Sequence, residues 1–309
     1  MPRPRTRPAQ GCAFLTLIEE LPQLLMNGLV QGSILAVPAI GFTAIYAVLR
    51  YANFTIASHA TIGAYAGFVA NVTLGLPAYV ALGFAFLVPA LSGVGVHIVA
   101  LRPLLRQGGP LTAAIAAVAM TIALENVVRF FFGNDLRGYD LPVYRDWRFD
   151  LGFAFMRIGP QQVENAAISV AVMAALFLFL AFTRTGKMMR AVADNAQLAS
   201  IKGVNAETVA RLANFLGMGL AGVGGMLLGL DTSIDPLTGF RAMLSVFAAA
   251  VVGGLGSIPG AVIGAMVVGI GEEFSLLVLD ASYRTAVGFV AIVVVLSFRP
   301  RGILGERAY

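Results

Sequence analysis

Long apolar stretches separated by short polar connections dominate the chain. Residues 24–49, 77–101, 111–132, 163–182 and 208–230 each supply the roughly 20 apolar residues that one helical crossing of a bilayer needs. Helices satisfy their own backbone in lipid, so these stretches are expected to be helical. With the shorter stretches, the pattern predicts an all-α polytopic membrane protein with about eight to nine transmembrane segments.

Two regions do not fit simple crossings and predict broken or half-depth helices. Residues 50–61 are too polar for a lipid-facing helix, although apolar character returns by residue 63. Residues 242–279 are too long for one span. About 14 apolar residues precede an interruption there, and a helix of that length reaches only about 20 Å. The residues expected to break the helix are Gly253, Gly254, Gly256, Pro259 and Gly260.

Basic residues in the connections predict the orientation. The polar insert at residues 184–206 carries four basic residues against the single acid Asp194, so it should lie in the cytoplasm. Residues 133–162 balance their acidic and basic residues, as an external loop does. The predicted organisation is a basic tail and approach to the membrane at 1–23, a transmembrane domain at 24–298, and a basic cytoplasmic tail at 299–309.

The amino-terminal tail conflicts with this orientation. If every apolar stretch crosses fully, the tail lies outside, yet Arg3, Arg5 and Arg7 favour the inside. A break of residues 50–74 at mid-depth would remove the conflict. Irregular backbone at that depth is tolerated where it is buried in protein or lines a cavity, and transporters build substrate sites from such broken helices.

The cytoplasmic insert contains a predicted amphipathic helix from Met188 to Ile201, ended by Gly203 as a left-handed residue. Two interpretations are open. The helix could lie on the anionic inner leaflet, or it could dock into a groove on a soluble cytoplasmic partner.

Polar residues within apolar stretches are the candidates for a translocation path. Asn53, Thr55, Ser58, His59 and Thr61 cluster in the expected break, where they either satisfy one another or line the path of a solute.

Three carboxylates also fall within apolar stretches. Glu125, next to Asn126, could pair with Arg129 four residues later or could take part in conduction. Glu272 and Glu273 allow either interpretation equally.

Composition supports the membrane class and excludes others. Of 309 residues, 58% are apolar and only 12% are charged, and the mean hydropathy is +0.84, which lies outside the range of soluble domains. The net charge of +5 comes from connections and tails, so it gives no reason to expect nucleic acid. One cysteine, Cys12, excludes an internal disulfide and a cysteine metal site, and no phosphate-binding loop of the Walker type occurs.

Glycine accounts for 35 residues, several in small-x3-small patterns such as Gly225-x3-Gly229 and Gly256-x3-Gly260. Such patterns let helix backbones approach closely in lipid. They serve either packing within the chain or contact with a homologous subunit.

Several blocks resemble the permeases of branched-chain amino-acid ABC importers. VGGLGSIPGAVIG at residues 252–264 and RPRGILG at 299–305 are close to a signature of that family. RAVADN at 190–195, IKGVN at 201–205, Asn53-Phe54 with Gly63-Ala64-Tyr65, and NVVRFFFG at 126–133 are also similar, in the family's order. The chain departs from the family at Ile56, Ala57 and Ser58, where His, Gly and Glu commonly stand.

The resemblance implies an ABC importer permease fold and a multi-pass protein of the bacterial inner membrane. It implies a homologous permease or second copy, two cytoplasmic ATPase subunits that bind ATP and Mg, a periplasmic substrate-binding protein, and surrounding lipid. This chain would bind no cofactor or metal. The implied ATPase-coupling residues are Arg190, Asp194, Gln197, Ala199 and Gly203.

Two other classes of membrane protein are alternatives. An ion-coupled secondary transporter would use Glu125, Glu272 or His59 as relay groups. An intramembrane enzyme would need a nucleophile with a base or a metal site, yet His59 and His97 are the only histidines. The substrate could also be urea or an amide, which related permeases carry.

Overall fold

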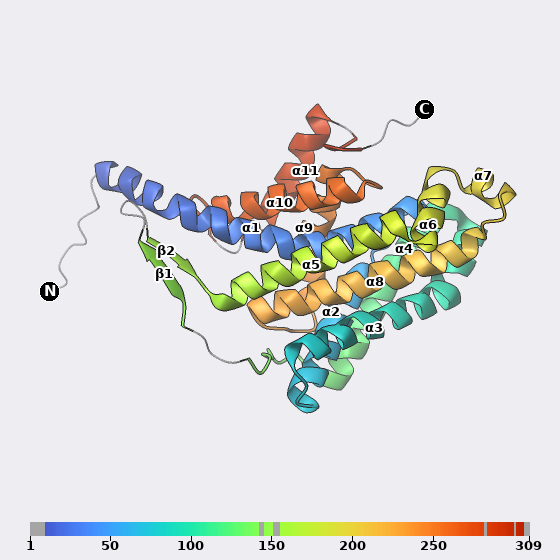
Figure 1. The fold of residues 1–309 in the computed structure, drawn as a ribbon, viewed down its shortest axis with the longest axis horizontal. Coiled ribbons are helices and arrows are strands. Elements are labelled where there is room, and N and C mark those ends of the chain that lie inside the picture. The colour runs from blue at the N-terminus through green and yellow to red at the C-terminus, as the bar shows by residue number, and fades with distance from the viewer. Residues whose placement is uncertain (1–9, 142–144, 151–154, 281–282, 300, 306–309) are drawn as a thin grey trace.

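The computed structural model describes residues 10–141, 145–150, 155–280, 283–299 and 301–305. The described chain is all-α apart from one hairpin, and its helices form an elongated bundle (Figure 1). Five helical stretches are long and apolar enough to cross a membrane, and α9 and α11 are shorter apolar helices. The elements are α1 (Gln10–Leu49), α2 (Ile56–Phe68), η1 (Val69–Thr73), α3 (Ala78–Val96), η2 (His97–Leu101), α4 (Arg102–Phe132), β1 (Trp147–Asp150), β2 (Phe155–Ile158), α5 (Pro160–Phe182), α6 (Arg184–Asp194), α7 (Ala196–Ile201), α8 (Ala206–Asp231), α9 (Thr238–Gly253), α10 (Ile258–Ser275) and α11 (Ala286–Phe298), where η marks π-helical turns.

Helices α1 and α8 form the buried centre of the bundle. Glycines on α8 allow neighbouring backbones to touch it: a Cβ added at Gly217 would collide with Ile45 of α1, and one at Gly222 would overlap α3 at Ala85 and Pro89. Apolar side chains gain little from association in lipid, so such close approach supplies the packing. Of the glycines in the predicted patterns, Gly225, Gly229 and Gly260 contact other parts of this chain, whereas Gly256 has nothing within 4 Å.

The chain between α1 and α2 is irregular, as expected for residues 50–61. Arg50 has a φ of 57°, and the helix resumes only at Ile56. The irregular segment leads inward from the end of α1: Asn53 and Thr55 are buried, and the carbonyl of Phe54 accepts a hydrogen bond of 3.0 Å from Thr121 in the middle of α4. Non-helical backbone is thus buried in protein inside the bundle.

From Ile56 onward the chain continues to the opposite end of the bundle. The Asn71 side chain in η1 accepts a hydrogen bond from the backbone of Asp140, within the connection that holds the hairpin. Helix α3 returns, and α4 kinks at Gly109, where φ is 76°.

The external connection predicted at 133–162 contains the antiparallel hairpin β1–β2. Gln23 of α1 donates to the carbonyl of Arg157 and accepts from its N–H, which fixes the hairpin against the start of α1. Tyr139 donates to the carbonyl of Ala64 at 2.7 Å, and burial raises the pKa of its phenol above the usual value. That phenol stays protonated and remains a donor.

The break predicted at Gly253–Gly260 separates α9 from α10. Helix α9 has 16 residues, or about 24 Å, which is short of the ~30 Å hydrocarbon core. Gly254 and Gly256 have φ values of 110° and 95°, and Ser257 caps α10 by accepting from the Gly260 N–H. Pro259 lies in the first turn of α10, where its missing N–H costs nothing.

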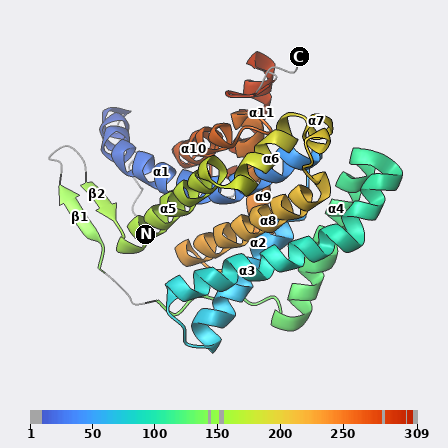
Figure 2. The same ribbon diagram turned by 45° about the vertical axis from the view of Figure 1, so that its right-hand side comes forward.

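The start of α1 and the cytoplasmic insert predicted at residues 184–206 lie far apart in the structure. The first turn of α1 and the hairpin lie at one end of the bundle, and α6 and α7 lie at the other (Figures 1 and 2). Residues 50–55 are irregular as predicted, and α2 with η1 then leads toward the end that holds the hairpin. The arginines Arg3, Arg5 and Arg7 fall outside the described residues.

Candidate functional site

The polar insert at residues 184–206 forms two short helices, so the prediction of one helix from Met188 to Ile201 is wrong. Helix α6 ends at Asp194, and Asn195 adopts an extended conformation between α6 and α7. The Asn195 side chain accepts a hydrogen bond of 2.9 Å from the Leu198 N–H and so caps α7. Gly203, with φ 84°, follows the end of α7 as predicted.

One face of this insert packs on the bundle and the other protrudes. Met189, Val192 and Ala199 are buried in the main core cluster. Leu198 and Ile201 of α7 are 56% and 79% exposed. The protruding end of the molecule therefore carries two neighbouring apolar side chains on a short capped helix.

The predicted coupling residues divide between these two faces. Ala199 is buried and anchors α7. The other four are exposed: Arg190, Asp194, Gln197 and Gly203.

Hydrogen bonds tie the insert to the bundle at several points. Thr183 caps α6 directly after α5 ends, and Asn205 caps α8 by accepting from the N–H groups of Glu207 and Thr208. The guanidinium of Arg50, at the end of α1, donates to the carbonyl of Ala193. The insert is thus held by α5, α8 and α1, and a displacement of it would be transmitted to all three.

An ion-pair cluster that the sequence interpretation missed lies beside the insert. Glu207, in the first turn of α8, contacts Arg102 at 2.5 Å and Arg106 at 3.3 Å, both from α4, and also Arg211 one turn further along α8. Only the i, i+4 spacing of Glu207 and Arg211 could have been found from the sequence. The contacts to α4 join positions about 100 residues apart.

The polar residues of the expected path form an internal network. Asn53 donates to Asn214 of α8 and accepts from the N–H and the hydroxyl of Thr55. The carbonyl of Thr55 in turn accepts from Ser58 and contacts the His59 ring at 2.7 Å.

Thr61 extends this network to another helix. Its hydroxyl accepts a hydrogen bond of 3.0 Å from the Gly239 N–H in the first turn of α9. All five predicted residues of the 53–61 cluster are buried, and most of their polar atoms bond within the protein, although the Nε2 of His59 has no partner among the described groups.

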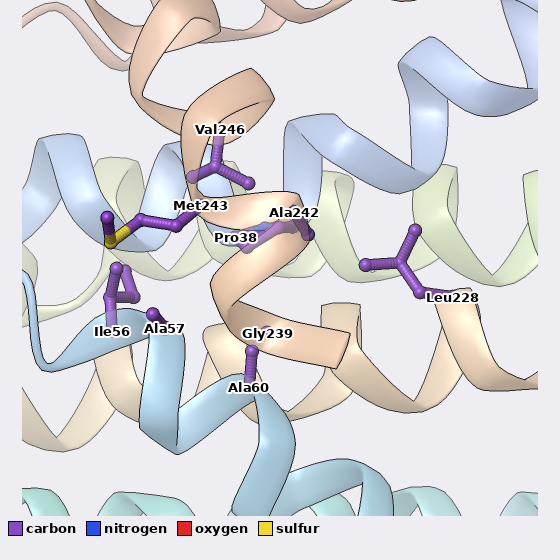
Figure 3. A pocket seen from close by; sticks show the side chains of 9 residues that line it. All are labelled: Pro38, Ile56, Ala57, Ala60, Leu228, Gly239, Ala242, Met243 and Val246. Atoms are coloured by element: carbon purple, nitrogen blue, oxygen red, sulfur yellow. The ribbon is translucent and has the colours of Figure 1, made fainter. Parts of the chain in front are cut away.

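The gap next to this network is too small for a solute. Figure 3 shows apolar side chains from α1, α2, α8 and α9 around it. Its volume is about 10 Å³, close to the space of one water molecule. It is lined by Pro38, Ile56, Ala57, Ala60, Leu228, Gly239, Ala242, Met243 and Val246.

A much larger groove opens between α3 and α5, with α8 as its floor. Its volume is about 420 Å³, and its lining is apolar. Helix α5, which forms one wall of the groove, leads directly into α6, and α8, which forms its floor, begins shortly after α7. The lining residues are Leu82, Phe86, Val172, Ala175, Leu176, Phe179, Leu216, Leu220 and Val223.

The expected pair of Glu125 and Arg129 is absent from the ion pairs of the described residues. Glu125 is buried on the face of α4 that meets α2, and its Oε1 has no partner among the described groups. Arg129 instead donates weakly to Asn126 at 3.5 Å, and Asn126 is exposed. Arg129 is half-buried and interacts with Glu125 electrostatically without forming an ion pair, a side-chain arrangement that the spacing of the two residues could not predict.

Glu272 and Glu273 are buried in an ion-pair group near the hairpin end. Arg284, just before α11, contacts both carboxylates, and Ser245 of α9 donates to Glu272 at 2.5 Å. This arrangement links α9, α10 and α11. In the described part of the chain, no group of three or more His, Cys, Asp or Glu residues could hold a metal ion.

Known proteins resemble the chain along most of its length. A family model described as "Branched-chain amino acid transport system / permease component" matches residues 24–297. The permease protein BraD of a high-affinity branched-chain amino acid transport system from Pseudomonas aeruginosa is 35% identical over 296 residues, which cover 92% of this chain and 95% of BraD.

Further relatives agree. The corresponding permease LivH of Escherichia coli K12 is also 35% identical with the same coverage. A probable LivH from Methanocaldococcus jannaschii is 28% identical over 297 residues, covering 91% of this chain and 92% of the relative. Among solved structures, PsaBC from Streptococcus pneumoniae in complex with Fab matches with a TM-score of 0.50 at 14% identity, covering 93% of this chain and 97% of that one, so it shows similarity of fold.

Proposed function

This chain belongs to the family of branched-chain amino-acid transport permease components, and we propose that it is the membrane-spanning subunit of an ATP-driven ABC importer for branched-chain or related amino acids. It transports rather than catalyses, and ATP hydrolysis takes place on separate subunits. The system lies in a bacterial inner membrane.

The observation that carries this proposal is the capped insert α6–α7. A short rigid helix with exposed Leu198 and Ile201, next to basic residues, fits the mode in which a helix lays apolar side chains into a groove on a partner. The partner is a cytoplasmic ATPase that binds ATP and Mg. Two such subunits, a related permease or second copy, and a periplasmic binding protein complete the transporter.

The mechanism is alternating access driven from this insert. ATP-driven closure of the ATPases displaces α6 and α7. This displacement reaches the bundle because Met189, Val192 and Ala199 of these helices are buried in its core. The movement passes to α5 and α8 through the capped junctions at Thr183 and Asn205, and to α1 through Arg50. Packed helices then shift between discrete arrangements.

The apolar groove between α3 and α5 is proposed as this chain's share of the path. Its volume of about 420 Å³ lies within the range of small-molecule sites, roughly 300–1,000 Å³. Its apolar lining suits an aliphatic side chain. Two of its three helices flank the insert, so movement of the insert changes its width, and a second permease would close its open side.

A matched pair of aspartate substitutions tests the docking role. Ile201→Asp places a charge in the proposed contact, whereas Val278→Asp changes an equally exposed residue, 86% exposed, near the end of α10. In proteoliposomes containing the assembled transporter, I201D should lower ATP-dependent amino-acid uptake by roughly tenfold or more, the effect of losing one anchor residue of an interface. V278D should transport normally.

Two outcomes would contradict the proposal. Normal uptake by I201D would remove α7 from the coupling path. Uptake in vesicles that lack ATP but hold a proton or sodium gradient would favour the ion-coupled secondary transporter instead.

A further inference from the structure

The ion-pair cluster beside the insert carries more positive charge than its acid neutralises. We name the Glu207 cluster by its members Glu207, Arg102, Arg106 and Arg211. One carboxylate is shared by three guanidinium groups, and among the described ion pairs these arginines have no other acidic partner. The cluster therefore retains two positive charges beyond its own acid.

Several donors of the Glu207 cluster remain free to bind a ligand. The side chains of Arg106 and Arg211 are 66% and 45% exposed, and each guanidinium has five N–H donors. The Nε of Arg102 is buried with no partner among the described groups. The Nδ1 of His97 is buried without a partner as well, and His97 interacts electrostatically with Arg102, Arg211 and Glu207.

The backbone around His97 is itself unusual. His97 begins the π-helical turn η2, which leads straight into Arg102. Such turns are rare and occur often at functional sites.

The surroundings of the cluster indicate what the ligand is. Val99, just before Arg102, is 79% exposed, and Leu111, after the kink at Gly109, is 74% exposed. The start of α4 lies at the end of the bundle that carries α6 and α7 (Figure 2). The arginines at the start of α4 and α8 therefore lie at this end, next to the exposed apolar residues. In a bilayer, this is the level of the phospholipid headgroups, with acyl chains beside Val99 and Leu111.

We propose that the Glu207 cluster binds the phosphate of an anionic phospholipid in the leaflet on the side of the insert. Arginine recognises phosphate oxygens through paired N–H donors, and basic pockets between transmembrane helices on this side of a membrane bind anionic headgroups. Arg106 and Arg211 contact the phosphate from α4 and α8, respectively. The lipid thereby bridges α4 to the first turn of α8, directly after the coupling insert.

An acidic protein surface is a less suitable occupant. Exposed apolar residues, Val99 of η2 and Leu111 of α4, flank the arginines. If a soluble subunit covered the cluster, these apolar side chains would face water. The helices α6 and α7 provide the protruding surface instead.

Native mass spectrometry of the intact transporter, reconstituted in phosphatidylcholine nanodiscs with and without phosphatidylglycerol, tests the site. The unmodified transporter should retain phosphatidylglycerol. The double variant R106Q/R211Q should retain it about 25-fold less, because each basic residue near a membrane surface contributes ~1 kcal/mol, or about fivefold. The control R184Q/K187Q removes the same charge from α6 and should retain the lipid normally.

Glu207→Gln separates a lipid site from a purely structural cluster. Removing the competing carboxylate should raise retention of phosphatidylglycerol, whereas a structural cluster would lose its organising group and retention would fall or stay unchanged. Inorganic phosphate should not displace the lipid; displacement would assign the site to free phosphate. Equal loss in both double variants, or unchanged retention in R106Q/R211Q, would overturn the proposal. Thermal unfolding of each variant identifies any that fail to fold.

Discussion

At the scale of single residues, the buried polar groups of α2 illustrate how a membrane protein satisfies irregular backbone. The Asn53 side chain accepts a hydrogen bond from the Thr55 N–H, just before α2 begins, and donates one to Asn214 of α8. Arg50 still donates its N–H to the Tyr46 carbonyl, but residues 51–55 have lost the helical pattern, and the side chains of Asn53 and Thr55 replace part of it. In a water-free environment such replacement decides whether a helix can be interrupted at all.

Asn53→Ala tests whether this network supports structure or solute movement. The substitution removes the acceptor of the Thr55 N–H and the donor to the Asn214 Oδ1, and we expect a loss of about 1–3 kcal/mol in the free energy of unfolding. Thermal unfolding of the purified transporter in detergent measures the loss. Asn126→Ala, on the exposed face of α4, is the control and should change stability little. Unchanged stability together with an altered KM for uptake would instead support the path interpretation of residues 53–61.

At the scale of elements, the chain uses one segment to cap another that is distant in sequence. The last carbonyl groups of α9 lack partners within their own helix. Ile303 and Leu304 donate backbone N–H groups to Val252 and Gly253, both at 2.9 Å. Gly302, with φ 79°, lies so close to Gly254 that a Cβ would not fit. The two most family-like sequence blocks thus contact each other.

Replacing Leu304 tests this cap. Leu304→Pro removes the N–H that Gly253 accepts, whereas Leu304→Ala keeps the N–H and shortens a half-exposed side chain. We expect the proline variant to be less stable than the alanine variant by about 1–3 kcal/mol, the cost of leaving one buried acceptor unpaired. Thermal unfolding and limited proteolysis of the two purified variants make the comparison. Equal stability would show that the segment 301–305 does not cap α9.

At the scale of the whole molecule, the apolar pattern predicts the helices well because bilayer thickness fixes their length. It also predicts the breaks near residues 50 and 253, where Asn53, Gly254 and Pro259 interrupt apolar runs. It does not predict that α6 ends at Asn195, because residues 188–201 are good helix formers and the break depends on one capping side chain.

Long-range contacts within the candidate site are equally hidden from the sequence. The contact of Arg102 with Glu207 depends on where α4 begins relative to the first turn of α8. The burial of the 53–61 cluster depends on how the start of α2 packs against α8 and α3. Neither has a short-range signature. Charge counting gives opposite signals for the two ends of α1, because arginines precede residue 10 and further basic residues lie at the insert end. The sequence therefore does not predict on which side the amino terminus lies.

Labelling of single cysteines tests the resulting orientation. In a Cys12→Ser background, Glu20→Cys places a thiol near the start of α1, at the end that holds the hairpin. Lys202→Cys places one on the exposed insert. The insert end holds Arg50, Arg102, Arg106 and the basic residues of the insert. We expect this excess of positive charge, rather than the basic tail, to decide which end is cytoplasmic, because the first helix does not always set the topology. A membrane-impermeant maleimide should therefore label E20C in intact cells and K202C only after permeabilisation. Labelling of both cysteines from the same side would contradict a full crossing by α1.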